Sequence, residues 1–121
     1  MAGESRFRPA HRIGRATGFD AVFSSRQVLR GNVFDLHYSS NTVGTPRIGL
    51  VVPKRLVGSA VMRNRVKRLT RELFRCRRNG LPCMDLVLRL ARLPSEGLPE
   101  GGLLRNDLDR LLQRLPKEAK P

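Results

Sequence analysis

Apolar and polar residues alternate in three segments of the chain, and this period of two predicts β-strands. The strands are expected at 33–38, 48–52 and 84–91, and Pro53 ends the second of them. In the first strand, one face is formed by Phe34, Leu36 and Tyr38, and the other by Asp35 and His37. In the third strand, the apolar face is formed by Met84, Leu86, Leu88 and Leu90.

A short helix is predicted at 18–26, because Thr17 and Asp20 have the spacing of a capping box. Phe19 and Phe23 lie four residues apart and therefore share one face of this helix. The sequence thus places two aromatic rings on one short surface.

The longest helix is predicted at 60–78, with Ser59 as its N-cap and Asn79-Gly80 as a left-handed C-cap. At about 100° per residue, its apolar stripe is formed by Met62, Val66, Leu69, Leu73 and Cys76. Cys76 is therefore expected in the core as a reduced thiol, and its spacing from Cys83 fits no zinc site. The opposite side carries Arg63, Asn64, Lys67, Arg68, Arg71, Arg75 and Arg78.

A last helix is predicted after the Gly- and Pro-rich loop 94–102, and Pro116 stops it. Its apolar face is formed by Leu104, Leu108, Leu111, Leu112 and Leu115. We expect a basic, extended arm at 1–16 and a polar tail at 117–121. The order α-β-β-α-β-α predicts one α+β domain spanning 1–121, a two-layer sandwich in which helices cover a small central sheet.

The charge of the chain indicates a polyanionic partner. Its 121 residues, 40% of them hydrophobic, suffice for one modest core, but 24 Lys and Arg against 10 Asp and Glu give a formal net charge of +14. A membrane is a poor candidate for that partner, because the longest apolar runs are far too short to span a bilayer. The polar, basic residues 1–15 predict no signal peptide, so we expect a cytoplasmic protein.

The positive charge is concentrated in residues 54–78, which contain ten basic residues and one acid, Glu72. A stripe of one sign repels itself by about 0.2–0.5 kcal/mol per i,i+4 pair, so it is favoured where a polyanion neutralises it. Arginine outnumbers lysine in the stripe, which suits bidentate phosphate contacts and stacking on bases. We therefore expect RNA binding rather than an ordinary solvated face.

Arg63-Asn64-Arg65, preceded by Lys54-Arg55, resembles the Arg-Asn-Arg signature of the bacterial ribonuclease P protein family. The resemblance extends from Arg12 to Leu115 and includes Phe19, Phe23 and the strands near 47–52 and 84–91. It implies a ribosomal protein S5 domain 2-like fold, in which a left-handed βαβ crossover passes through the long helix. Because about 98% of such crossovers are right-handed, the handedness is a test of the resemblance.

The resemblance also implies a function. In that family a large RNA with bound Mg²⁺ is the catalyst, and the protein binds this RNA and the 5′ leader of precursor tRNA, whose removal gives the mature 5′ end. The residues implied to contact the catalytic RNA and phosphates are Lys54, Arg63, Asn64, Arg65, Lys67, Arg68, Arg71 and Arg75. Those implied to form the leader cleft are Phe19, Phe23, His37, Arg55, Arg63 and Asn64. His37 occupies a position where the family often has tyrosine, which implies weaker stacking that depends on pH.

A protein nuclease is disfavoured by the residues themselves. The acids are scattered over different elements, and Asp107 and Asp109 point in diverging directions on one helix. No phosphate-binding glycine loop, nucleophile motif or metal site is recognisable, so we expect no catalytic side chains, with Mg²⁺ held by RNA and no obligate protein partner. A ribosomal or other structural RNA-binding role is the alternative, but it leaves the aromatic pair beside the Arg-Asn-Arg helix unexplained.

Overall fold

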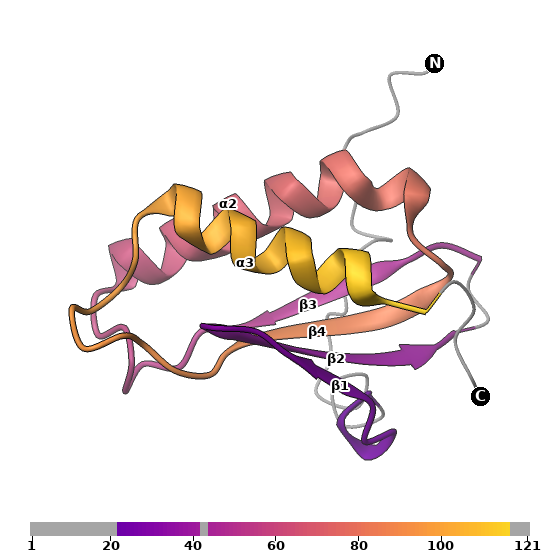
Figure 1. Ribbon diagram of the computed structural model, residues 1–121, viewed down its shortest axis with the longest axis horizontal. Coiled ribbons are helices and arrows are strands. Elements are labelled where there is room, and N and C mark those ends of the chain that lie inside the picture. Colours follow the sequence, from indigo (N-terminus) through magenta and orange to yellow (C-terminus); the bar gives the residue numbers. More distant parts are fainter. Residues whose placement is uncertain (1–21, 42–43, 117–121) are drawn as a thin grey trace.

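A computed structural model describes residues 22–41 and 44–116, where four strands form one mixed sheet (Figure 1). The strands are β1 (Val28–Arg30), β2 (Phe34–Ser40), β3 (Arg47–Val51) and β4 (Met84–Leu90). Their order in the sheet is β1-β2-β4-β3; β2 pairs antiparallel with β1 and β4, and β3 runs parallel to β4. The three predicted strands are confirmed within one or two residues, and the short β1 was not predicted.

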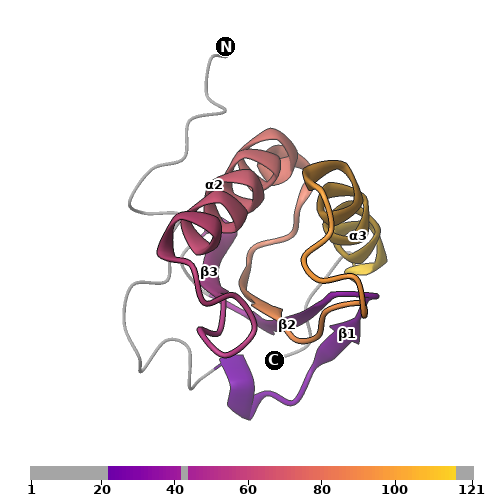
Figure 2. The same ribbon diagram turned by 90° about the vertical axis from the view of Figure 1, so that its left-hand side faces the viewer.

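Two helices cover one face of the sheet, as the end-on view shows (Figure 2). They are α2 (Ala60–Arg77), which continues into the 3-10 turn η2 (Arg78–Gly80), and α3 (Gly101–Arg114). Residues 22–24 are also helical and lie below the sheet, on its second face, which we define as the face turned away from α2 and α3. The predicted two-layer arrangement of helices on one sheet is confirmed.

The connection from β3 through α2 to β4 is left-handed. The two strands are parallel neighbours, and α2 lies over the β3 side of the sheet (Figures 1 and 2). Seen from the helices, with both strands pointing up, β4 lies to the left of β3. Because crossovers of this hand are rare, this feature separates the fold from ordinary βαβ units and agrees with the expectation from the resemblance.

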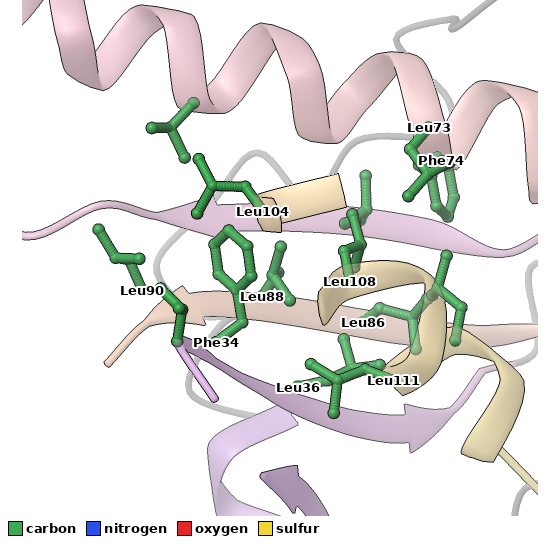
Figure 3. Close-up of a cluster of buried hydrophobic side chains, with 14 of the residues drawn as sticks. Phe34, Leu36, Leu73, Phe74, Leu86, Leu88, Leu90, Leu104, Leu108 and Leu111 are labelled. Carbon is green, nitrogen blue, oxygen red and sulfur yellow. The ribbon is translucent and has the colours of Figure 1, made fainter. Parts of the chain in front are cut away.

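The core lies between the sheet and the two helices (Figure 3). It contains fully buried side chains from β2, β4, α2 and α3, among them Phe34, Leu36, Phe74, Leu86, Leu88, Leu90, Leu108 and Leu111. Each large apolar side chain buried in this way contributes about 1.5–3 kcal/mol relative to exposure. The alternating apolar residues of β4 and the leucine stripe of α3 thus pack in the core, as their spacing predicts.

The predicted core position of Cys76 is wrong. Cys76 is exposed, and the buried residues of α2 are Val66, Thr70, Leu73 and Phe74, with Met62 and Leu69 partly buried against the core. The Thr70 hydroxyl donates to the Val66 carbonyl at 2.8 Å, so the polar group is satisfied inside the helix and can be buried. The buried face of α2 is therefore centred nearer to Phe74 than the apolar spacing alone indicates.

Among the predicted helix ends that fall within the described residues, the start of α2 is confirmed, whereas the C-terminal ends of α2 and of the short helix need correction. Ser59 caps α2 as expected, since its hydroxyl accepts from the Met62 amide at 3.3 Å. Gly80, however, has no positive φ; α2 instead tightens into η2, and the Leu81 amide donates to the Arg78 carbonyl. The short helix predicted at 18–26 ends at residue 24, because Arg26 adopts a φ of 57° and turns the chain into β1. Thr17 and the start of that helix lie outside the described residues, as do the basic arm and the polar tail.

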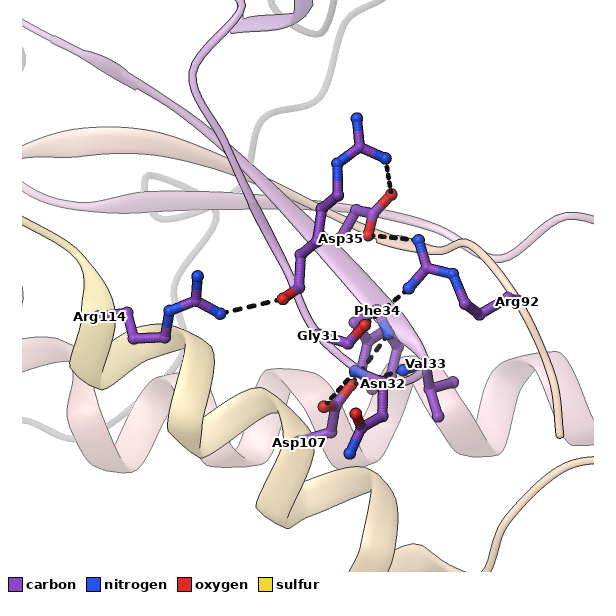
Figure 4. Close-up of polar contacts among 9 residues, drawn as sticks. Gly31, Asn32, Val33, Phe34, Asp35, Arg92, Asp107 and Arg114 are labelled. Atoms are coloured by element: carbon purple, nitrogen blue, oxygen red, sulfur yellow. Dashed lines mark hydrogen bonds and ion pairs between the residues drawn. The ribbon is translucent and has the colours of Figure 1, made fainter.

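Asp107 on α3 fastens this helix to the β1–β2 turn (Figure 4). Its Oδ1 accepts from the Asn32 amide at 2.8 Å, and its Oδ2 accepts from the amides of Val33 and Phe34 at 3.0 Å each. A Cβ on Gly31 would lie 2.7 Å from the carboxylate, so the turn requires glycine there. Asp107 thus joins α3 to the edge of the sheet, a role that its place among the scattered acids of the sequence does not reveal.

Candidate nucleic-acid interface

The side of α2 that faces away from the core is strongly basic. Asn64, Arg65 and Arg68 are exposed, and Lys67 and Arg71 are half-buried beside them. Lys54 and Arg55 are exposed in the turn that follows β3 and leads toward the helix. The packed side of α2 holds the helix on the sheet, so these cations are presented on a rigid element, as phosphate binding requires.

Arg63 has a structural contact that the sequence does not reveal. Its Nη1 donates to the carbonyl oxygens of Val57 at 2.9 Å and Gly58 at 2.8 Å, in the loop that precedes α2. The guanidinium therefore holds this loop against the first turns of the helix. Its remaining N–H groups keep the capacity to donate to a phosphate, since one guanidinium carries five donors.

Arg75 and Arg77 of α2 form ion pairs with acids. Arg75 binds Glu72 one turn earlier, and the guanidinium lowers the pKa of the Glu72 carboxyl chiefly through their hydrogen bond. Arg77 pairs with Asp109 at 2.9 Å and thereby links α2 to α3. Asp107 and Asp109 do diverge as predicted, one to the β1–β2 turn and the other to Arg77. Arg75, one of the predicted phosphate contacts, thus already shares its charge with an acid.

The second face of the sheet carries a small aromatic surface. Val22 packs on Val87 of β4, and Phe23 and Val51 pack around them. The Phe23 ring meets the His37 ring edge to face, with centroids 4.7 Å apart. Phe23 and His37, both predicted to form the leader cleft, are thus in contact with each other. Phe19 lies outside the described residues.

The α2 cations and the Phe23–His37 pair belong to opposite faces of the sheet: α2 covers one face (Figure 2), and the aromatic surface extends over the other from His37 on β2 across Val87 on β4 to Val51 on β3. Val51 of β3 touches the aromatic cluster, and α2 lies over the same strand. An RNA bound along α2 and a strand of RNA on the second face would therefore meet around the β3 edge.

The pKa of His37 lies below its ordinary value. Burial is the main cause, and the charges of Arg89 and Arg30 lower the pKa further, whereas Asp35 opposes them. The neutral imidazole is therefore the form that the folded protein favours. Arg89 was not among the predicted site residues, although the period of two in β4 places it on the same face as Val87.

We predict that His37 makes the protein less stable in mild acid. Because the folded pKa is lower than the unfolded value near 6.5, the unfolded chain binds more protons as the pH falls below that value. The contribution of neutral His37 to the free energy of unfolding is complete above pH about 6.5, and it declines as the pH falls toward the folded pKa. Urea unfolding of wild type and His37→Gln between pH 7.5 and 5 should show the steeper loss in the wild type. His11 is present in both proteins and cancels, and parallel curves would contradict the prediction.

Other classes of site find little support in the described residues. None of the helices in the described ranges has the length and apolarity needed to cross a bilayer. Within the same ranges, no three of His, Cys, Asp and Glu gather as metal ligands would. The arginine-rich face of α2 and the aromatic surface on the second face are thus the two features that suggest binding.

Comparison with known proteins agrees with these features. The family model described as Ribonuclease P matches residues 7–116. The ribonuclease P protein component of Azoarcus sp. (strain BH72) is 43% identical over 114 residues, covering 94% of this chain and 93% of that protein. The component from Edwardsiella ictaluri (strain 93-146) is 43% identical over 104 residues, with 84% of each chain covered.

Solved structures show the same fold. The RNase P protein from Thermotoga maritima superposes with a TM-score of 0.76 at 28% identity, covering 87% of this chain and 97% of that one. The RNase P protein from Staphylococcus aureus, at 23% identity, shares the fold with a TM-score of 0.78 and covers 85% of this chain and 93% of its own. From the family match and these relatives, we conclude that the chain belongs to the ribonuclease P protein family.

Proposed function

We propose that this protein is the protein subunit of a ribonuclease P, an endoribonuclease that removes the 5′ leader of precursor tRNA. The catalytic RNA binds along the exposed side of α2, and the leader lies on the second face over Phe23 and His37. The RNA and its Mg²⁺ carry out hydrolysis of the phosphodiester, and the protein supplies binding and positioning. Family membership supports the general role, and the division between the two RNAs is the specific proposal.

The exposed side of α2 is the observation that carries the proposal. Its cations are exposed or half-buried on a helix whose other side is fixed in the core, and Glu72 is its one acid. Neutralising these charges with phosphates releases counterions, which favours association of the protein with RNA. The same effect lowers the repulsion between catalytic RNA and substrate, and we therefore expect the protein to reduce the Mg²⁺ concentration needed for cleavage.

Reconstitution tests this function directly. At low Mg²⁺, the protein together with the cognate catalytic RNA should cleave a precursor tRNA at its mature 5′ end, whereas neither should do so efficiently alone. Cleavage by the protein alone would overturn the assignment of catalysis to RNA. Binding of the RNA without recovery of cleavage would favour a purely structural role.

Removing two exposed charges from α2 should weaken binding of the catalytic RNA. For Arg65→Ala with Arg68→Ala, we expect a roughly 10- to 100-fold loss of affinity near physiological salt and a salt slope reduced by about 2. Filter binding at several salt concentrations measures both quantities. The matched control is Arg105→Ala with Arg110→Ala, which removes two exposed charges from α3. Equal losses in the two double variants would show that the α2 surface has no special role.

The aromatic surface should matter for the leader instead. Phe19→Ala with Phe23→Ala is expected to weaken binding of precursor tRNA with a leader while leaving affinity for the catalytic RNA nearly unchanged, since stacking of one base contributes about 1–3 kcal/mol. Competition between precursor and mature tRNA for the reconstituted complex measures the difference. If both double variants reduced affinity for both RNAs alike, the division between the two surfaces would be wrong.

A further inference from the structure

Arg89 lies on the second face of the sheet, close to the aromatic surface. On β4, the residues before and after it, Leu88 and Leu90, are buried in the core, so its side chain extends from the other face. In the register of the sheet, Arg89 stands opposite Asp35 of β2 and Val51 of β3. The next row of that face, two residues earlier on β4, pairs Val87 with His37.

The acid opposite Arg89 is occupied by other cations. The Asp35 carboxylate accepts from Arg92 Nη2 at 2.8 Å and has Arg30 Nη1 at 3.9 Å (Figure 4). Arg92 is held in place by a second hydrogen bond, from its Nη1 to the Gly31 carbonyl at 2.7 Å. Asp35 is itself largely buried, so its position on the strand leaves little freedom to change partner.

Arg89 is consequently a cation without an acid of its own in the part of the chain that the structure describes. Its Nε is buried and has no hydrogen-bond partner among those residues. Buried polar groups are almost always paired, so the unpaired Nε marks a guanidinium whose donors are not used by the described protein. The residue as a whole is half-buried rather than buried, so a ligand would contact the part of the guanidinium other than Nε. Arg30, Arg89 and Arg92 together bring three positive charges to one carboxylate, so this part of the second face has a net positive charge.

The same charge reaches the aromatic surface. Arg89 and Arg30 both lower the pKa of His37, which shows that their field extends to the imidazole that contacts Phe23. Two residues along a strand correspond to about 6.6 Å, so a nucleotide with its base over the Phe23–His37 pair has its phosphate within reach of the Arg89 side chain. A guanidinium suits this contact because its planar donors match two phosphate oxygens.

We infer that Arg89 is a phosphate-binding residue for the single-stranded RNA that lies over the Phe23–His37 pair. The inference rests on the proposed function and extends it: the leader is held by its backbone as well as by stacking. One leader phosphodiester supplies the acceptor that Asp35 does not provide. Arg30, whose side chain is 71% exposed, is free to turn from Asp35 and share that phosphate.

The test compares Arg89→Gln, Arg89→Lys and wild type in the complex with catalytic RNA. For precursor tRNA with a leader, Arg89→Gln should bind roughly tenfold more weakly, the size expected for loss of one charge-assisted hydrogen bond. Affinity for mature tRNA, which has no leader, should stay within about twofold of wild type. Arg89→Lys keeps the charge but not the bidentate geometry and should recover part of the loss. The matched control is Arg105→Gln, an exposed arginine of α3, which should bind both RNAs as wild type does.

Neutral methylphosphonate linkages placed one at a time in the leader identify the phosphate. One linkage should weaken binding of the wild-type complex several-fold and have little effect on the Arg89→Gln complex. If Arg89→Gln did not fold, the scan with wild type and Arg89→Lys would decide, and an equal response of both proteins at every linkage would refute the inference. Unchanged leader binding by a folded Arg89→Gln protein, or equal weakening for mature tRNA, would refute it as well. These results leave the proposed function intact, because that function fails only if wild type does not restore cleavage.

Discussion

Asp107→Ala is expected to lower the free energy of unfolding by about 3–5 kcal/mol. The substitution removes a carboxylate that accepts from three backbone amides, and those of Val33 and Phe34 are buried. Each buried donor left without a partner costs about 1–3 kcal/mol. Because small domains are stable by only about 5–15 kcal/mol, the variant should be close to unfolding at room temperature. Urea denaturation followed by circular dichroism measures the change.

The neighbouring acid on the same helix provides the control for that loss. Asp109 forms its ion pair with Arg77 near the surface, where the side chains are 25% and 53% exposed. Pairs of this kind contribute about 0–1 kcal/mol, so Asp109→Ala should change stability little. Both substitutions remove one negative charge from α3, and only the buried contact differs between them. Similar losses in the two variants would mean that Asp107 does not hold the β1–β2 turn.

Phe74→Ala should also destabilise the protein, by about 3–5 kcal/mol, because it removes a fully buried ring from the core. Cys76→Ala, two residues later on α2, should change the free energy of unfolding by less than about 0.5 kcal/mol, since this side chain is exposed. The pair decides which face of the helix is buried. A large loss for Cys76→Ala with a small loss for Phe74→Ala would restore the face predicted from apolar spacing.

The error at Cys76 has a physical origin. The spacing of Met62, Val66, Leu69 and Leu73 indicates a stripe that would include Cys76. Because α2 packs on the sheet and on α3 together, its buried face is instead centred on Val66, Thr70, Leu73 and Phe74, and Cys76 lies outside it. Thr70 conceals part of that face in the sequence, because its hydroxyl looks polar until its bond to the Val66 carbonyl is known. The strands were easier to predict, because every second residue of β4 is a large apolar side chain that packs against the helices.

Contacts between distant segments were not predictable. Asp107 lies more than 70 residues along the chain from the amides that it binds, and the three residues of β1 are too few for a recognisable period. The basic side of α2, by contrast, follows from residues three and four apart and was predicted almost completely. The contact of Arg63 with the loop before α2, and the isolation of Arg89 from Asp35, depend on geometry that spacing does not contain.

The position of β4 has a consequence for how the chain acquires its structure. This strand comes late in the sequence, yet it lies between β2 and β3, which have no other connection in the sheet. While the ribosome has released the chain only as far as α2, β2 and β3 cannot be joined and the apolar side of the helix has no surface to cover it. The sheet should therefore form only after Leu90, the last residue of β4, has left the ribosome. Because the strand pairs are distant in sequence, we expect this folding step to be cooperative and comparatively slow.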